Sequence, residues 1–139
     1  MDVGTIRSLC LAMPHVTEHV QWGESLVFKI GRQALGDGAK LFAIAGLDEA
    51  NQFICFKSTP EEFAELIEIE GIVPAPYLAR SHWVSAVDLD ALPLAELKRR
   101  LERSYQLIFD NFPKTKQARI RGEAAPVARR KKSVARKKK

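Results

Sequence analysis

Three short apolar runs lie close together in the first half of the sequence, and they constrain the fold more than any other feature. Residues 25–30, 40–45 and 52–57 each have the length and the bulky side chains of a β-strand. Within the first run Leu26 and Phe28 alternate with less apolar positions, as in a strand with one buried face. Short connections between consecutive strands favour antiparallel pairing, so the sequence predicts an antiparallel sheet.

Helical patterns flank these strands. Val3, Ile6 and Cys10 recur at spacings of three and four, which predicts a first helix that ends before Pro14. Thr59 precedes a proline and two glutamates, the pattern of a capped helix N-terminus. A last helix is predicted from apolar residues spaced three or four apart: Leu94, Leu97, Leu101, Tyr105, Ile108 and Phe112.

The remaining segments complete the expected order of elements. Residues 14–24 are predicted to be a connection, residues 72–81 a proline-rich loop, and residues 82–87 a further strand. The fold class is therefore α/β of the α+β type, an antiparallel sheet packed with helices in the order α-β-β-β-α-β-α.

Charge is divided unevenly along the chain. Residues 1–110 carry ten Lys or Arg and sixteen Asp or Glu, a net charge of −6, whereas residues 111–139 carry twelve and one, a net charge of +11. Large apolar side chains are almost absent after residue 113, so burial there cannot offset the entropy of ordering. We expect a folded domain over residues 1–113 and a disordered Lys/Arg/Ala-rich tail over residues 114–139.

The cations of this tail are the strongest functional signal in the sequence. Such runs bind nucleic-acid phosphates by counterion release, without sequence preference. We therefore expect non-specific DNA binding through eight tail residues: Arg129, Arg130, Lys131, Lys132, Arg136, Lys137, Lys138 and Lys139. A solubilising role, contact with anionic lipid and self-association with the acidic body are the competing interpretations.

A second candidate region surrounds the proline-rich loop. Arg80, His82 and Trp83 join this loop to a strand, with Tyr77 nearby in the sequence. Exposed arginine and aromatic side chains can contact phosphates and bases. The competing interpretation is that Tyr77 and Trp83 pack into the core and Arg80 pairs with an acidic neighbour. A small-ligand or protein-binding pocket near Tyr77, His82 and Trp83 is the alternative function.

Catalytic signatures are weak. His15, Glu18 and His19 match the H-x-x-E-H pattern of zinc peptidases, but a preceding proline and two valines disfavour the helix that this pattern needs. A metal-binding protein is thus the least favoured hypothesis. Cys10 and Cys55 lie in apolar surroundings and are expected to be buried free thiols. We expect no enzyme activity, no cofactor and no bound metal.

The expected location is the cytoplasm. No apolar run approaches the ~18–20 residues that span a bilayer, and the first residues lack the pattern of a secretory signal. We expect no membrane partner and favour a monomer.

The sequence also resembles the MmcQ/YjbR family of small bacterial proteins over residues 5–113. The most specific stretch is residues 71–84, which read Gly-Ile-Val-Pro-Ala-Pro-Tyr-Leu-Ala-Arg-Ser-His-Trp-Val. Further matching positions are residues 9–14, Glu18, Trp22, Gly23, residues 26–30, 41–43 and 56–57, the helix that begins at Pro60, and Leu89 through the final helix. The resemblance implies a CyaY-like fold and a double-wing DNA-binding protein. The tail from residue 114 lies outside the family pattern and resembles the basic tails of bacterial nucleoid proteins, so the expected location of the protein is the nucleoid. The implied contacts of the folded body are Lys57, Arg80, His82 and Trp83.

Overall fold

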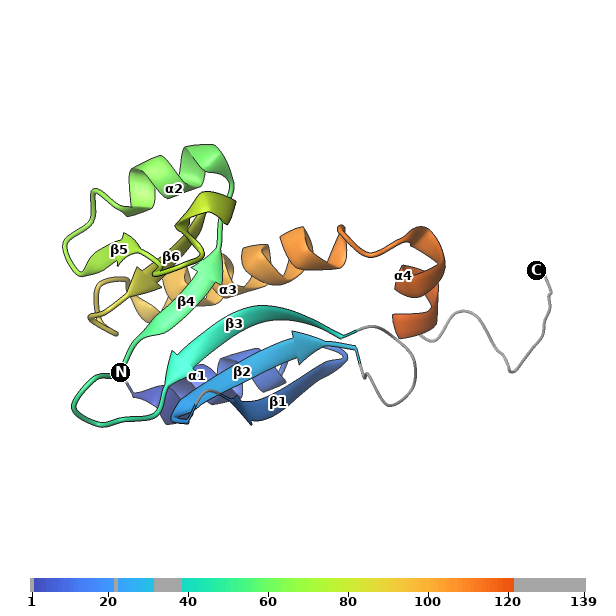
Figure 1. Cartoon of the computed structure of the whole chain (residues 1–139), viewed down its shortest axis with the longest axis horizontal. Helices are drawn as coiled ribbons and strands as arrows, with labels where there is room; N and C mark the ends of the chain where they lie inside the picture. The colour runs from blue at the N-terminus through green and yellow to red at the C-terminus, as the bar shows by residue number, and fades with distance from the viewer. Residues whose placement is uncertain (1, 22, 32–38, 122–139) are drawn as a thin grey trace.

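A computed structural model describes residues 2–21, 23–31 and 39–121 (Figure 1). Its elements, in chain order, are α1 (Val3–Leu11), β1 (Val16–Gln21), β2 (Ser25–Ile30), β3 (Lys40–Gly46), β4 (Ile54–Lys57), α2 (Pro60–Leu66), β5 (Ile72–Pro74), the 3₁₀ helix η2 (Ala79–Ser81), β6 (Trp83–Ala86), α3 (Leu94–Phe109) and α4 (Lys114–Ile120). This mixed α+β architecture confirms the predicted fold class, but the predicted order α-β-β-β-α-β-α lacks β1, β5 and α4, and β5 lies within the predicted loop 72–81.

Six strands form one antiparallel sheet in the order β1-β2-β3-β4-β6-β5. The predicted meander is its centre, β2 to β4. The prediction that residues 14–24 form a connection is wrong, because Val16 to Gln21 pair in continuous register with β2. The β-branched side chains of Val16, Thr17 and Val20 favour that extended backbone.

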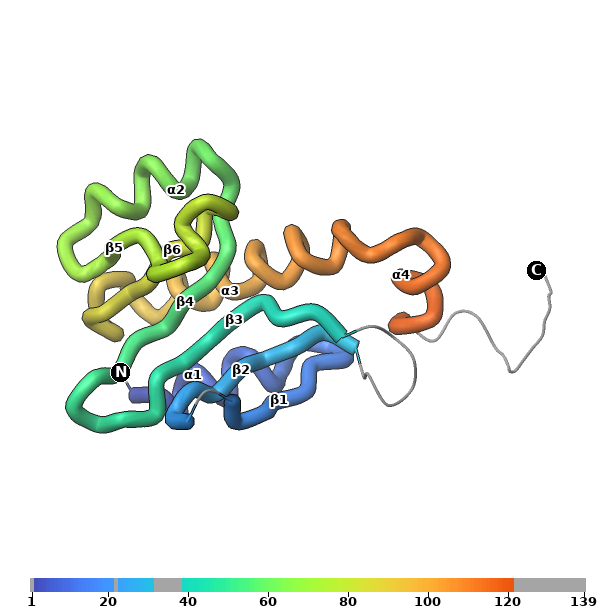
Figure 2. The backbone as a smooth tube through the Cα atoms, viewed as in Figure 1, coloured from blue at the N-terminus to red at the C-terminus, as the bar shows by residue number. Residues whose placement is uncertain are grey.

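The two longest helices pack on one face of the sheet. Figures 1 and 2 show α1 and α3 on the same side of the strands, with α2 beside β5 and β6. α1 is capped by Asp2, whose carboxylate accepts the backbone N–H of Thr5 at 2.8 Å. α2 begins with the predicted capping box, formed reciprocally by Thr59 and Glu62. α3 ends at Phe109 and not at Phe112 as the periodicity predicted.

The C-terminal helix α4 differs from the expectation that disorder begins at residue 114. Gln117 and Ile120 are buried, and the side-chain amide of Gln117 donates to the carbonyl of Phe112 at 2.8 Å. The guanidinium of Arg121 lies 5.4 Å from the ring centroid of Phe109. One apolar side chain and these contacts therefore hold seven residues beyond the predicted domain boundary. The tail cations at 129–139 lie outside the described residues.

The hydroxyl of Ser104 joins α3 to the middle of the sheet. A register shift in the pairing of β2 with β3 leaves Phe42 without a partner in β2, which makes it a β-bulge. Ser104 Oγ donates to the carbonyl oxygen of Phe42 at 2.7 Å and accepts the N–H of Lys57 at 2.9 Å. Ser104 is fully buried, so its one hydroxyl satisfies a backbone group on each of two strands where their own pairing ends.

We expect Ser104→Ala to lower the free energy of unfolding by about 2–4 kcal/mol, because it leaves one buried carbonyl and one buried N–H unpaired. Urea unfolding measures this loss. Ser8→Ala, at an exposed serine of α1, is the control and should change the free energy by less than about 0.5 kcal/mol. Equal effects of the two substitutions would contradict the bridging role of Ser104.

Candidate functional site

The segment between β5 and β6, residues 75–82, brings the predicted site residues together; we call it the 75–82 loop. Ala75 donates its N–H to the carbonyl of Trp83 at 3.0 Å, and Trp83 donates to the carbonyl of Leu78 at 3.3 Å. These bonds fold the loop back against the start of β6. Pro74 and Pro76 restrict its backbone at the beginning.

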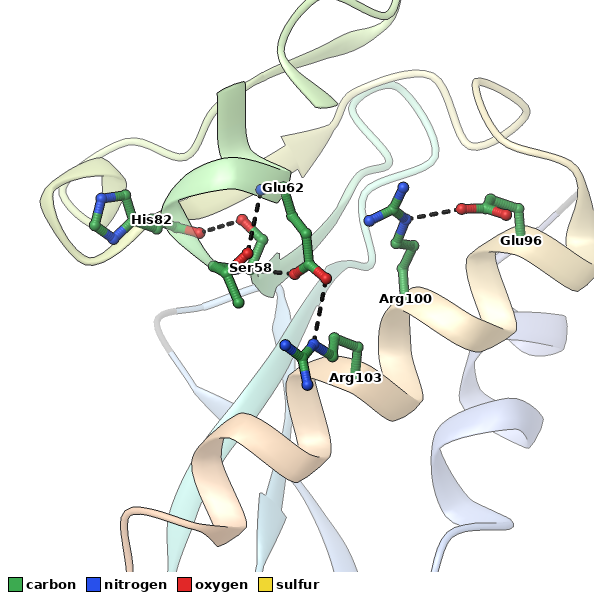
Figure 3. Close-up of polar contacts among 7 residues, drawn as sticks. Ser58, Glu62, His82, Glu96, Arg100 and Arg103 are labelled. Carbon is green, nitrogen blue, oxygen red and sulfur yellow. Dashed lines mark hydrogen bonds and ion pairs between the residues drawn. The ribbon is translucent and has the colours of Figure 1, made fainter. Parts of the chain in front are cut away.

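His82 forms a fixed corner at the end of this loop. Its backbone has φ +65°, and its carbonyl oxygen accepts two bonds from Ser58, at 2.9 Å from the N–H and 2.7 Å from Oγ (Figure 3). The imidazole packs edge-on against the ring of Phe63 with centroids 5.7 Å apart. The main role of His82 in this geometry is to hold the loop against α2.

Glu62 ties α2 to α3 next to this corner. Its carboxylate accepts the N–H of Thr59 at 3.0 Å and the Nε–H of Arg103 at 3.2 Å (Figure 3). Partial burial raises the pKa of Glu62, but the hydrogen bond from Thr59 and the charge of Arg103 outweigh it and hold the pKa below its usual value. The loop, α2 and α3 are therefore connected by one set of polar contacts.

The four predicted contacts of the folded body differ in availability. Lys57 Nζ donates to the carbonyl oxygen of Ser81 at 2.7 Å, so this ammonium caps the end of η2. Trp83 is 5% exposed, which leaves no ring face for a base to stack on. Arg80 is exposed and makes no ion pair or hydrogen bond with any residue that the structure describes. The expected pairing of Arg80 with an acidic neighbour is absent from that part of the chain.

The cations of α3 are already paired. Lys98 lies 3.0 Å from Glu102, and Arg100 lies 2.8 Å from Glu96 (Figure 3). Arg99 shares Glu96 with Arg100. Together with the Glu62–Arg103 pair, these contacts give each cation of α3 an acidic partner and set four cations against three carboxylates, which leaves a residual charge of only +1.

Tyr77 does not pack into the core as one interpretation expected. Its side chain is fully exposed, and its backbone has φ +66°. For a bulky aromatic residue this left-handed conformation costs about 1–2 kcal/mol, and such strain concentrates at functional sites. Tyr77 is thus an exposed aromatic group that the loop holds in an unfavourable backbone conformation.

Tyr77 also borders an apolar cavity of about 630 Å³. The cavity is lined by Ser25, Leu41, Ile44, Phe53, Cys55, Pro76, Tyr77 and Leu78. The pocket predicted near Tyr77, His82 and Trp83 therefore shares only Tyr77 with the cavity observed. Half of the lining comes from β2, β3 and β4, and Phe53 directly precedes β4. Sequence reasoning missed the cavity because the strand residues meet through strand pairing.

The H-x-x-E-H segment lies on a turn and a strand. Glu18 and His19 are consecutive on β1, so their side chains point to opposite faces of the sheet. Glu18 binds Arg7 at 2.7 Å, and this hydrogen bond and charge lower the pKa of Glu18. His19 Nε2 lies 3.1 Å from Thr17 Oγ1. Within residues 2–21, 23–31 and 39–121, no three His, Cys, Asp or Glu side chains are grouped to hold a metal ion.

Both cysteines are buried and free, as the sequence predicted. Burial raises the pKa of the Cys10 thiol to about 12 and also raises the pKa of Cys55, so both thiols are poor nucleophiles at neutral pH. In the described part of the chain, no helix is long and apolar enough to cross a membrane.

Comparisons with known proteins agree with this fold. The model of the YjbR family matches residues 11–107, and the chain belongs to that family. The uncharacterized protein YbdF of Escherichia coli O157:H7 is 28% identical over 119 residues, covering 84% of this chain and 92% of its own length.

Two solved structures share the architecture. The Deinococcus radiodurans protein DR2400, described as a DUF419 domain, superimposes with a TM-score of 0.76 and 26% identity, over 89% of this chain and 91% of its own. A protein from Pseudomonas syringae has a TM-score of 0.62 and 21% identity, over 77% of this chain and 98% of its own, and shows likeness of fold alone.

Because the pKa of Glu62 is lowered in the folded chain, part of the free energy of unfolding depends on pH. A carboxyl whose pKa is lower in the folded chain stabilises the fold above its unfolded pKa, about 4.3, and this contribution is lost as the pH falls through the folded pKa. We expect Glu62→Gln to lower the free energy of unfolding more at pH 7 than at pH 3 in urea titrations. Glu65→Gln, on an exposed side chain of the same helix, is the control, with an expected change below about 0.5 kcal/mol at both pH values.

The strain at Tyr77 can be measured with two substitutions that remove the same ring. We expect Tyr77→Gly to be more stable than Tyr77→Ala by about 1 kcal/mol in urea unfolding, because glycine accepts φ +66° without cost. Tyr77→Gly should be at least as stable as the original chain, since the exposed ring contributes no buried area. Equal stability of the two variants would show that the backbone is not strained.

Proposed function

We propose that this YjbR-family protein is a non-enzymatic DNA-binding protein whose tail neutralises phosphates without sequence preference. The observation that carries the proposal is the concentration of eight Lys or Arg within residues 129–139. The proposal assigns no catalytic step and no cofactor to the chain, and it places the protein on DNA in the bacterial nucleoid. The chain acts as a monomer in this proposal.

The charge distribution of the folded body supports a secondary role for it. Residues 1–110 carry a net charge of −6, which repels a duplex at long range. Arg80 is the exposed cation of the predicted body site that has no protein partner among the described residues, whereas Lys57 Nζ already donates to the carbonyl of Ser81 and Trp83 is buried. We assign Arg80 at most one phosphate contact, which orients the body once the tail has bound.

Binding to a fluorescent random-sequence duplex at several salt concentrations tests this proposal. If the eight tail cations engage duplex phosphates, the slope of log K against log salt is roughly −7. Replacing all eight with glutamine in the full chain should abolish binding at about 150 mM salt. Arg80→Gln should leave most of the affinity and reduce the steepness of the slope by about 0.9 at most.

A tail with the same residues in scrambled order is the matched control. Because counterion release depends on charge and not on order, the scrambled chain should bind with unchanged affinity and slope. Binding by the glutamine variant equal to that of the original chain would refute the proposed role of the tail and return attention to the body.

A further inference from the structure

The apolar cavity lies on the sheet face opposite α1 and α3. The ring of Phe42 meets Tyr105 of α3 with centroids 5.5 Å apart, so Phe42 faces the helices. Leu41, its neighbour along β3, points to the other face and lines the cavity. Ile44 and Cys55, which pair across β3 and β4, form the rest of its sheet floor.

Particular residues create the space. The bulge at Phe42 changes the alternation of β3, so Leu41 shares a face with Ile44, three positions away. At the other end of the cavity the paired residues Ser25 and Gly46 are small. The ring of Phe53 occupies the position next to Gly46, where a Cβ would lie 2.5 Å from a ring carbon. The cavity therefore results from the bulge at Phe42 in the pairing of β2 with β3 and from the small residues at its other end.

Two lysines lie on the same face of the sheet as one end of the cavity, just outside its lining residues. Lys29 pairs directly with Leu41 and so shares its face of the sheet. β4 runs antiparallel to β3, so its last residue, Lys57, lies beside the beginning of β3 and on the same face as Cys55, two residues earlier. Lys29 and Lys57 therefore lie on the two strands that flank β3, at the end of the sheet where β3 begins.

These ammonium groups can accept an anion. Lys29 makes no ion pair or hydrogen bond with any residue the structure describes, and it is half-buried. Lys57 uses one of its three N–H donors in the hydrogen bond to the carbonyl of Ser81, which leaves two for an anion. No Asp or Glu is among the residues that line the cavity. The cavity thus has apolar walls without acidic groups, and two lysines lie beyond its lining on the same face of the sheet.

We propose that this cavity binds a medium-chain alkyl carboxylate. The alkyl chain lies against Leu41, Ile44 and Leu78, and the carboxylate lies between Lys29 and Lys57. The volume of about 630 Å³ falls within the range of small-molecule sites. An apolar wall with a few polar groups at one end is the usual composition of such sites. This activity is independent of the proposed DNA binding.

Three probes with the same twelve-carbon chain test the proposal on the full-length protein: dodecanoate, dodecanol and dodecylammonium, below their micelle concentrations. Methyl NMR shifts locate binding, and calorimetry gives affinity and stoichiometry. We expect one saturable site, with shifts at the methyl groups of Leu41, Ile44 and Leu78. Dodecanoate should bind about 3- to 10-fold more tightly than dodecanol, and dodecylammonium should bind most weakly of the three.

Substitutions separate the apolar walls from the charge. Leu41→Phe, at a half-buried position, and Ile44→Phe should each fill the cavity and weaken all three probes at least tenfold. Lys29→Gln should weaken dodecanoate alone by about 3- to 10-fold. Lys98→Gln, which removes a lysine from α3, is the matched control and should change nothing. Circular dichroism and thermal unfolding confirm that each variant is folded.

Several outcomes would overturn the proposal. Equal affinity for dodecanoate and dodecylammonium would refute the proposed contact of the carboxylate with the lysines. Unchanged affinity in both cavity-filling variants, provided that they fold, would show that the probes do not bind in the cavity. Shifts confined to the tail, abolished in the glutamine-tail chain, would mean that dodecanoate only binds tail cations. Dimerisation that Leu41→Phe disrupts would mean that this face binds a second copy. DNA binding measured on the same variants distinguishes failure here from failure of the tail proposal.

Discussion

The buried hydroxyl of Ser104 is the contact on which the arrangement of the sheet depends. It occupies the position where β3 and β4 stop pairing with each other, and it satisfies one backbone group on each strand. Because α3 carries this hydroxyl, the helix is fixed in height and rotation relative to the bulge at Phe42. Without a partner, the bulge would leave a carbonyl unpaired in the core, at a cost comparable to a large part of a small domain's stability.

The bulge also separates two surfaces with different chemistry. It turns Phe42 toward α3, where its ring meets Tyr105, and turns Leu41 toward the opposite face. The first surface becomes the main core under the helices. The second becomes the floor of an apolar cavity with Lys29 beside it. One inserted residue in β3 therefore serves both the packing of the fold and the shape of the candidate ligand site.

The sequence predicted the features that local chemistry determines. The capping box at Thr59, the strand beginning at Ser25 and the apolar face of α3 follow from residues within one or two turns of each other. The strand β1 was missed because its polar, mixed sequence gives a weak strand pattern, to which the pairing with β2 adds the stabilising contacts. The helix α4 was missed because its composition resembles the tail and its stability comes from a few buried contacts.

The candidate site was less predictable than the fold. The sequence placed Arg80 in the loop and His82 at the start of the next strand, whereas that strand begins at Trp83. It could not show that Lys57 binds Ser81 or that Trp83 is buried while Tyr77 is exposed.

The attachment of α4 limits how far the tail can reach. Residues 122–139 follow a helix anchored by Gln117 and Ile120, and eighteen residues extend at most about 60 Å. Any polyanion that the tail cations bind is therefore kept within about 60 Å of the end of α4.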